Sequence, residues 1–198
     1  EAKELHHCRG DYCFFTAGFS HGGGQTAPCN CSHGNNPLRD AVEAALLDNP
    51  NVQNAGSFGD TGLATVAPKM YQYYHNTMVK LKREYGDELK FPYENSLYAC
   101  TTFNFGPKAV TFPHLDYLNL ANGFCTILAL GDYNYKTGGH LVLHSLKLII
   151  EFPPNSSFTI MSACCVHSNI GIAPHEYRWS MTQYSVGGLF RWVENNFR

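Results

Sequence analysis

The spacing of apolar residues changes near residue 96 of this chain. Before that point, apolar residues recur at helical intervals in two stretches. One helix is predicted to begin at Pro37, with Asn36 as its N-cap, and to end at Asn49. A second helix is predicted over residues 68–85, with Gly86 as its C-terminal cap. The apolar face of each helix predicts packing against a core.

After residue 96, short apolar or alternating runs replace the helical pattern, and turn residues separate them. The predicted strands cover residues 97–105, 109–112, 123–130, 140–143, 147–152, 157–161, 170–172 and 179–186. About eight short strands of this kind are typical of a jelly roll or a related double-sheet barrel. The sequence therefore predicts an α+β, mainly β, fold. In it, helices and loops of residues 1–95 pack on a double-stranded β-helix (jelly-roll) core of residues 96–198, all as one domain, residues 1–198.

Composition supports a compact protein. The chain has 198 residues, of which 44% are hydrophobic and 15% charged, and this balance argues against disorder. It contains no run of eighteen apolar residues, so no membrane span is expected. The net charge of −2 gives no overall electrostatic signature of nucleic-acid binding, so any such contact must come from a local patch or a partner. A monomer is expected.

Eight cysteines allow more than one interpretation. A disulfide framework is one, but Cys125 lies in an apolar run, and the adjacent Cys164 and Cys165 have Cβ atoms that point apart. Reduced, mostly buried thiols in an intracellular protein are favoured. Structural zinc remains an alternative, although the spacings match no finger pattern. Its candidate ligands are His6, His7, Cys8, Cys13, Cys29, Cys31 and His33.

A His-x-Asp pair, His114 and Asp116, is the strongest chemical signal. Two positions apart on a strand, both side chains project to the same face. His167 follows a later predicted strand, which a sandwich can bring beside the first. Two imidazoles and one carboxylate form the facial triad that holds Fe(II) and leaves positions open for a co-substrate and dioxygen.

His-x-Asp also occurs by chance, and the chain has ten histidines. Further features raise the metal interpretation above chance. Arg178 and Ser180, two residues apart, share one face of a predicted strand and can bind one carboxylate together. The segment 138–141 resembles the turn and strand that lie between the Asp and the distal His in 2-oxoglutarate oxygenases. The order of these motifs predicts oxidation that depends on Fe(II) and 2-oxoglutarate.

Longer motifs resemble one family. Residues 114–123 resemble the His-x-Asp-x-x-Asn-x-x-Asn-Gly segment of TET-type DNA dioxygenases. Ala99, Cys100 and Phe103 resemble the Ala-Cys-x-x-Phe strand of these enzymes, and the segment 178–184 resembles their closing strand. Other motifs are similar to the fungal, transposon-associated branch of the TET/JBP family. They are residues 22–25, 104–107, 138–143, 151–154, 182–184 and 188–193.

The resemblance implies roles for these residues. The two histidines and the aspartate hold Fe(II). Arg178 binds the distal carboxylate of 2-oxoglutarate with help from Ser180, and His140 contacts the same co-substrate. Dioxygen is the oxidant. The fold implied is the jelly roll already predicted from the strand pattern.

The resemblance also implies contacts to a flipped base. Asn119 lies where the family contacts the base, and Tyr184 lies where an aromatic ring stacks on it. A base must leave the duplex stack to reach such a centre, so a polar contact and an aromatic face are needed. Val186 departs from the family, which often has a His there. Base identity would then be read by Gln25, Asn104 or Asn119.

The expected activity is oxidation of 5-methylcytosine in duplex DNA to 5-hydroxymethylcytosine and further products, in the nucleus. The departure at Val186 leaves N6-methyladenine demethylation open as an alternative. A third interpretation is a 2-oxoglutarate oxygenase that acts on a protein or a small molecule, because fold and cofactor are shared across substrates. A binding module without catalysis is disfavoured by the intact triad and Arg178.

Overall fold

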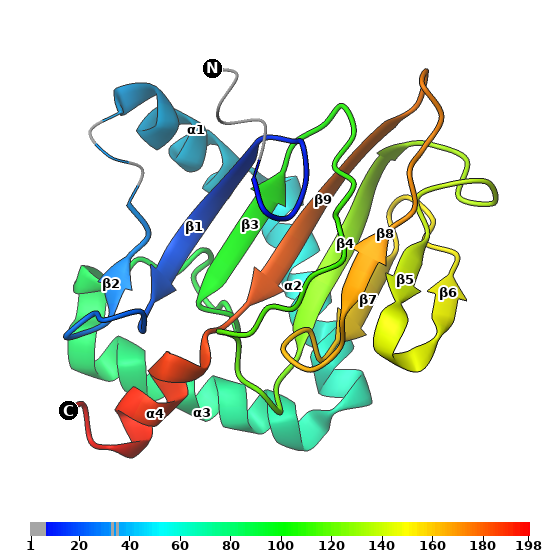
Figure 1. Ribbon diagram of the computed structural model, residues 1–198. Coiled ribbons are helices and arrows are strands. Elements are labelled where there is room, and N and C mark those ends of the chain that lie inside the picture. Colours follow the sequence, from blue (N-terminus) through cyan, green and yellow to red (C-terminus); the bar gives the residue numbers. More distant parts are fainter. Residues whose placement is uncertain (1–6, 33, 35) are drawn as a thin grey trace. The chain divides into compact units, whose positions relative to one another are not determined.

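A computed structural model describes residues 7–32, 34 and 36–198. The chain forms two compact units. Unit 1 comprises Glu1–Phe15 and Thr102–Thr182, and unit 2 comprises Thr16–Thr101 and Gln183–Arg198. Figure 1 labels the elements, and the division falls within three strands: β1 (Phe14–Ser20), β3 (Cys100–Asn104) and β9 (Tyr177–Tyr184).

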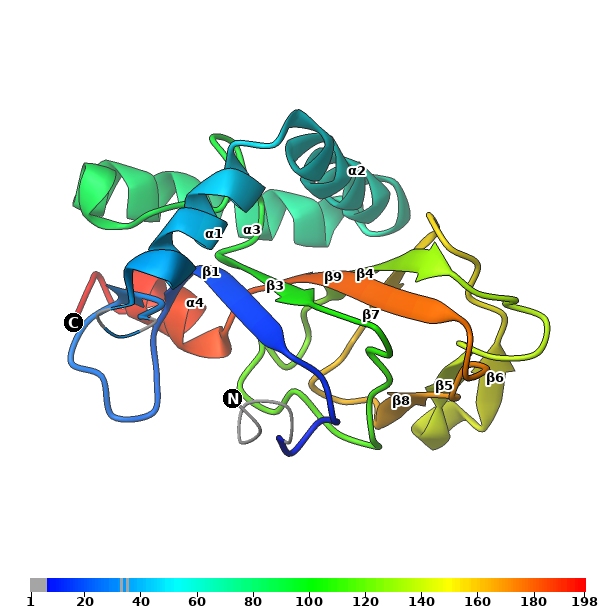
Figure 2. The ribbon, with the colours of Figure 1, turned by 90° about the horizontal axis from the view of Figure 1, so that it is seen from above.

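Unit 2 contains the four α-helices of the described residues: α1 (Pro37–Leu47), α2 (Pro50–Val66), α3 (Pro68–Tyr85) and α4 (Gly187–Glu194). The predicted helices at 37–49 and 68–85 are confirmed as α1 and α3. Asn36 caps α1, because its side chain accepts hydrogen bonds from the backbone N–H groups of Leu38 and Arg39. In Figure 2, α1, α2 and α3 lie on one side of β1.

The sequence did not predict α2, because its glycines and polar residues hide its buried stripe. That stripe consists of Gly56, Gly59 and Leu63. A Cβ atom built on Gly56 would lie 2.5 Å from the ring of Tyr93. Gly56 is therefore required by packing across the helix surface, although glycine is a weak helix former.

Helix α4 was also missed. Its Phe190 packs against two aromatic rings of α3, with centroid distances of 5.1 Å to Tyr73 and 4.8 Å to Tyr74. The indole Nε1 of Trp192 donates to the hydroxyl of Tyr85 at 2.7 Å. These contacts hold a short helix that has little stability of its own. Short 3₁₀ helices follow α3 at Gly86–Glu88 and occur at His144–Leu146.

The strand neighbours in unit 2 follow the order β2-β1-β3-β9. The short β2 (Cys29–Asn30) pairs antiparallel with β1, with Phe19 opposite Asn30. The N-terminal part was expected to contain loops and helices, so β1 and β2 correct that expectation. Three consecutive residues of β1, Ala17, Gly18 and Phe19, are buried, so this strand lacks the alternation by which a strand is predicted.

In unit 1, the strand neighbours follow the order β3-β9-β4-β7. The strands β4 (Cys125–Asp132) and β7 (Ser157–Ile160) pair antiparallel, with Cys125 opposite Ile160. A second sheet has the order β6-β5-β8, from β6 (Leu148–Ile150), β5 (Leu141–Leu143) and β8 (His167–Asn169). The described residues thus form a mixed α/β structure with antiparallel strand pairs.

Two predicted strands are wrong in unit 1. Residues 109–112 form no strand. Isolated bridges lie on either side of them, between Lys108 and Arg178 and between His114 and His167. The strand expected at 170–172 lies instead at His167–Asn169. The apolar pattern suggested the later position, but pairing with β5 selects the earlier one, with Leu143 opposite His167.

All eight cysteines are free thiols. Cys100, Cys125 and Cys165 are buried, whereas Cys8, Cys29 and Cys164 are exposed. No described helix combines the length and the hydropathy needed to cross a membrane.

Candidate metal centre

Three side chains of unit 1 converge on one point. The potential ligand atoms of His114, Asp116 and His167 all lie within 4.8 Å of one another. The Nε2 atom of His114 is 3.8 Å from Asp116 Oδ1, and Nε2 of His167 is 4.0 Å from Asp116 Oδ2. Within residues 7–32, 34 and 36–198, this is the one group of three or more such side chains that could hold a metal ion.

Backbone pairing brings these distant residues together. His114 and His167 exchange two backbone hydrogen bonds, at 3.1 and 3.0 Å, as an isolated antiparallel bridge. The backbone N–H of Asp116 donates to the carbonyl of Ser162 at 3.1 Å. His114 and Asp116 therefore lie on an extended segment, and not on the strand that was predicted. Their alternation still directs both side chains to the same centre.

Second hydrogen bonds orient both imidazoles. Nδ1 of His114 lies 2.7 Å from the carbonyl of Phe112, and Nδ1 of His167 lies 2.9 Å from the carbonyl of Cys165. A carbonyl only accepts, so each Nδ1 carries the proton and each Nε2 lone pair is free to ligate. Burial and the neighbouring His167 lower the pKa of His114, which favours the neutral ligand form. Two neutral imidazoles and one carboxylate fit a divalent iron ion.

Arg9 is a charged neighbour of the centre that sequence reasoning missed. Its Nη2 atom lies 2.8 Å from Asp116 Oδ1. The backbone N–H of Phe112 donates to the carbonyl of Arg9 at 2.8 Å, and this bond fixes the two segments beside each other. Arg9 stands more than a hundred positions before Asp116, and no local motif marks it.

Arg178 is a buried cation in the same unit, with a relative exposure of 1%. Its Nη1 donates to the carbonyl of Ala109, and its Cζ lies 6.0 and 5.9 Å from the ring centres of Tyr133 and Phe152. Its Nε atom is buried without a hydrogen-bond partner. In the described part of the chain, no carboxylate forms an ion pair with it. Burial lowers the pKa of Arg178. A guanidinium nonetheless keeps its proton in proteins, so this site favours an anion.

Ser180 and His140 are the two other residues predicted to bind the co-substrate, and both belong to unit 1. Ser180 is buried on the same face of β9 as Arg178, and its Oγ accepts a hydrogen bond from Asn104 Nδ2 at 3.0 Å. Asn104, expected as a base reader, is thus paired with Ser180. His140 directly precedes β5, the neighbour of the strand that carries His167. Its Nδ1 is buried and has no partner, so it can donate to or accept from a ligand.

Asn119 closes a turn that starts at Asp116, the carboxylate of the candidate metal centre. Its backbone N–H donates to the carbonyl of Asp116 at 2.9 Å. Its side-chain Nδ2 donates to the hydroxyl of Ser162 at 3.0 Å. The predicted base contact is therefore held beside the predicted iron ligand by a buried serine.

The remaining predicted base contacts belong to unit 2. Gln25 is used within its own loop, where Oε1 accepts from Gly22 N and Nε2 donates to Cys29 Sγ, both at 2.9 Å. Tyr184 is the half-buried last residue of β9. Val186 is buried and precedes the first residue of α4.

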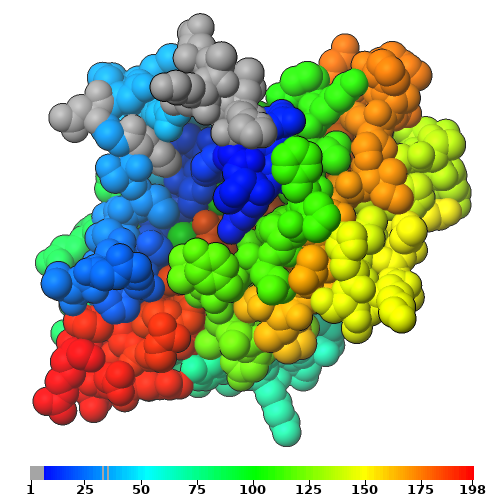
Figure 3. Space-filling view, viewed as in Figure 1, coloured from blue at the N-terminus to red at the C-terminus, as the bar shows by residue number. Residues whose placement is uncertain are grey.

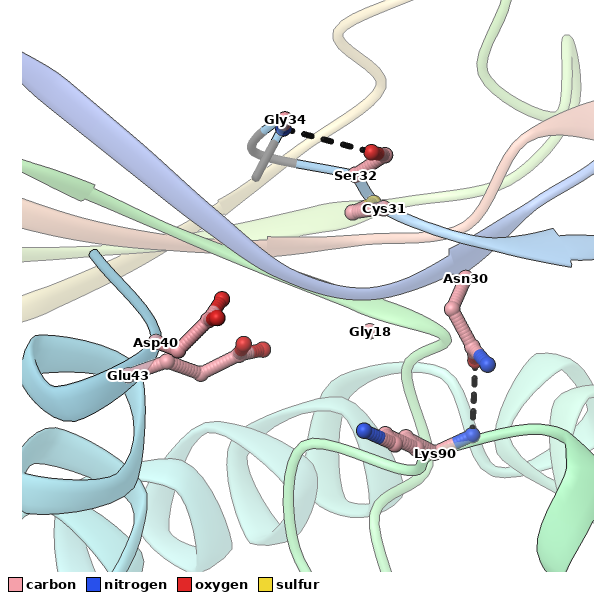
Figure 4. Close-up of a pocket in the computed structure, with 8 residues that line it drawn as sticks. All are labelled: Gly18, Asn30, Cys31, Ser32, Gly34, Asp40, Glu43 and Lys90. Carbon is pink, nitrogen blue, oxygen red and sulfur yellow. Dashed lines mark hydrogen bonds between the residues drawn. The ribbon is translucent and has the colours of Figure 1, made fainter. Parts of the chain in front are cut away.

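The alternative zinc site finds no support in the described residues. Cys8, Cys13, Cys29, Cys31 and His7 form no group of three potential ligands there. His6 and His33 lie outside the described residues. A cavity of about 220 Å³ in unit 2 is lined by Gly18, Asn30, Cys31, Ser32, Gly34, Asp40, Glu43 and Lys90. Figure 4 shows Asp40 and Glu43 projecting from α1 in this cavity. Its lining includes the candidate zinc ligand Cys31 but none of the residues predicted to bind iron, 2-oxoglutarate or a base.

No protein-family model and no curated protein matches the chain. Among solved structures, NgTET1 in complex with 5mC DNA is similar to 88% of this chain, with a TM-score of 0.63 and 17% identity. This chain covers 61% of that protein's length. A viral collagen prolyl hydroxylase, vCPH from Paramecium Bursaria Chlorella virus-1 in a 2OG complex, has a TM-score of 0.35 and 12% identity. That match covers 58% of this chain and 70% of vCPH. The first similarity shows that the chain has the fold of NgTET1.

Proposed function

We propose that this protein is an Fe(II)- and 2-oxoglutarate-dependent dioxygenase that oxidises the methyl group of a flipped base in DNA, with 5-methylcytosine as its first substrate. The proposal includes a double-stranded β-helix core and membership of the TET/JBP family, in its fungal branch. Because the substrate is genomic DNA, it also places the protein in the nucleus. A fold shared with NgTET1, which was solved with 5mC DNA, supports this substrate class.

The observation that carries the proposal is the buried Arg178, which lies in the same unit as the triad and forms no ion pair with a carboxylate of the described residues. A buried charge without a counter-ion is unfavourable, and a bound anion would supply the counter-charge. The segment between residues 107 and 114 connects the two features. Its start pairs with Arg178 through backbone hydrogen bonds at Pro107 and Ala109, and its end pairs with His167. A small dicarboxylate that ligates the metal at one end and Arg178 at the other fits this arrangement.

The roles of the side chains follow from their geometry. His114, Asp116 and His167 would hold Fe(II), and the bound iron with 2-oxoglutarate and dioxygen supplies the oxidant for a methyl C–H bond. Arg178 and Ser180 bind the distal carboxylate, and His140 contacts the co-substrate. The carbonyls of Phe112 and Cys165 keep both imidazoles in the ligating tautomer. Asn119 would contact the base beside the centre and orient its methyl group.

One observation favours a second substrate. Val186 is buried and apolar, so it offers no hydrogen bond to a cytosine edge. Cytosine would then depend on Asn119 for recognition, and N6-methyladenine remains a candidate on the same scaffold. The two bases carry different donors and acceptors on their edges. The proposed enzyme would disfavour the base that leaves a buried donor or acceptor without a hydrogen-bond partner.

The test is incubation of the protein with Fe(II), 2-oxoglutarate and duplex DNA that carries 5-methylcytosine, N6-methyladenine or no modified base. Mass spectrometry of the nucleosides and a succinate assay provide the readouts. We expect oxidation of 5-methylcytosine and no oxidation with His114→Ala or after metal removal by a chelator. Oxidation of neither base would contradict the proposal. Succinate release stimulated by a peptide alone would instead indicate a protein substrate.

A further inference from the structure

The turn next to the metal ligand is anchored at both ends and apolar at its tip. Asp116 and Asn119 close it with a backbone hydrogen bond of 2.9 Å. Ser162, which is 1% exposed, accepts from the Asp116 backbone N–H at 3.1 Å and from the Asn119 side chain at 3.0 Å. The two central residues, Tyr117 and Leu118, are thus presented on a rigid base.

These two residues are unusual for their positions. Turns favour Gly, Pro, Asn, Asp and Ser, whereas Tyr117 is 79% exposed and Leu118 is 55% exposed here. Phe112 and Leu115 of the same segment are exposed as well. Figure 3 shows that part of the green stretch of the chain, the colour range that includes this turn, lies at the surface. Clustered exposed apolar side chains mark a surface that contacts a partner.

We propose that Tyr117 and Leu118 form a wedge that enters duplex DNA at the place from which the target base has been extruded. This inference rests on the proposed function. A base that reaches the metal must lie beside Asp116, the residue that precedes the tip. Its departure leaves a gap in the stack, and proteins that open base steps insert apolar side chains of this kind. The tyrosine ring stacks on the neighbouring base pair, and the leucine fills the remaining space.

The anchoring by Ser162 explains how the wedge and the metal act together. The tip, the ligand Asp116 and the base contact Asn119 belong to one turn of four residues, so they keep a common position. A wedge stabilises only the state in which the duplex has been opened. It therefore matters for a paired base and not for a base that is already unstacked.

The experiment compares one methylated sequence in three forms: as a duplex, as a single strand, and as a duplex with an abasic site opposite the methylated base. For Tyr117→Ala combined with Leu118→Ala, we expect kcat/KM on the paired duplex to fall by roughly tenfold, the scale of one lost base–aromatic stack. Activity on the single strand should stay within about twofold, because it has no duplex stack to open. The duplex with the abasic site lacks the pairing but keeps the stack, so its loss should lie between the other two. Tyr117→Phe keeps the ring and should retain duplex activity. Phe58→Ala, which removes a ring that is 57% exposed on α2, is the matched control.

Fluorescence of 2-aminopurine placed next to the target base reports opening directly, and it should rise with the wild type and less with the double variant. An equal loss on all three substrates, or no loss on the duplex, would overturn the wedge. No loss on any of the three forms is the expected outcome if the patch binds a protein instead, because the assay contains no such partner. If the wild type oxidises the single strand but the variants match it on the duplex, the wedge fails while the proposed function stands. If the wild type oxidises no base, both fail.

Discussion

The guanidinium of Arg9 lies 2.8 Å from the carboxylate of Asp116, so this candidate metal ligand is paired with a cation. The pair joins the N-terminal segment to the residue that would carry the only negative charge of the triad. A divalent metal ion at this centre is repelled by Arg9 and competes with it for Oδ1. Arg9 is half-exposed, so water weakens this repulsion without abolishing it.

Replacing Arg9 by Gln should therefore tighten metal binding. A neighbouring unit charge at such a distance is worth about 1 kcal/mol in a solvated setting, so we expect an affinity gain of about fivefold. Calorimetric titration with Mn(II), a redox-stable substitute for Fe(II), measures it. Weaker binding by Arg9→Gln would mean that Arg9 positions Asp116 more than it repels the ion.

Replacing Arg178 by Met should stabilise the protein without its co-substrate and abolish the stabilisation by 2-oxoglutarate. The reason is that Arg178 is buried without a counter-ion among the described residues, and a buried unpaired charge opposes folding. In the wild type, 2-oxoglutarate should raise the melting temperature in the presence of Mn(II), because a ligand that binds only the folded state stabilises it.

Thermal unfolding with and without the co-substrate measures both effects. Arg191→Met, at an exposed position of α4, serves as the control for loss of a positive charge. A large drop in the melting temperature of ligand-free Arg178→Met would show that the guanidinium is a structural element and not an anion site.

Asp60 makes the stability of the protein depend on pH. Burial raises the pKa of Asp60 to about 7 from 3.8, although the backbone N–H of Leu97 opposes this by donating to its carboxylate at 3.1 Å. Between these two pKa values the folded state binds a proton that the unfolded state has released. The free energy of unfolding therefore decreases as pH rises from about 4 to about 7, by an amount on the order of 4 kcal/mol.

The variant Asp60→Asn lacks this titration and keeps an acceptor for Leu97. We expect its melting temperature to exceed that of the wild type at pH 8, with a difference that shrinks as pH falls toward 5. Chemical denaturation at the two pH values gives the free energies. A difference that is the same at both pH values would be inconsistent with a raised pKa at this site.

The close approach of α2 to Tyr93 predicts an intolerant glycine. A Cβ atom at position 56 would meet the Tyr93 ring at 2.5 Å, so Gly56→Ala should destabilise the protein by about 1–3 kcal/mol despite the better helix propensity of alanine. Ser57→Ala, at the next and exposed position of the helix, should have little effect. Equal stability of the two variants in urea denaturation would argue against this packing.

Several features follow from short stretches of sequence. The start of α1 could be predicted from the sequence because its cap is local. The side chain of Asn36 accepts hydrogen bonds from Leu38 and Arg39, which are close to it in the chain. The alternation of His114 and Asp116 is likewise local, and it directs both side chains to one centre even though the segment forms no strand. Arg178 and Ser180 lie on the same face of β9 for the same local reason, because they are two residues apart on a strand.

Long-range packing determined the rest. Helix α2 depends on a glycine that accommodates Tyr93, and α4 depends on rings of α3. The position of β8 depends on pairing with β5, which moved the strand onto His167 itself. None of these partners is adjacent in the chain, so residue spacing alone carries no signal for them.

The sequence by itself therefore determined which side chains could ligate iron, which could bind a carboxylate, and their order along the chain. These properties depend on the chemistry of each residue and on its nearest neighbours. Only the tertiary structure decided that His114 and His167 share a backbone bridge and that Arg9 pairs with Asp116. It also decided that Arg178 is buried with no carboxylate partner in the part of the chain that is described. The physical reason is that hydrogen bonds across the fold and exclusion of water are collective. They exist only after residues far apart in the chain have packed together.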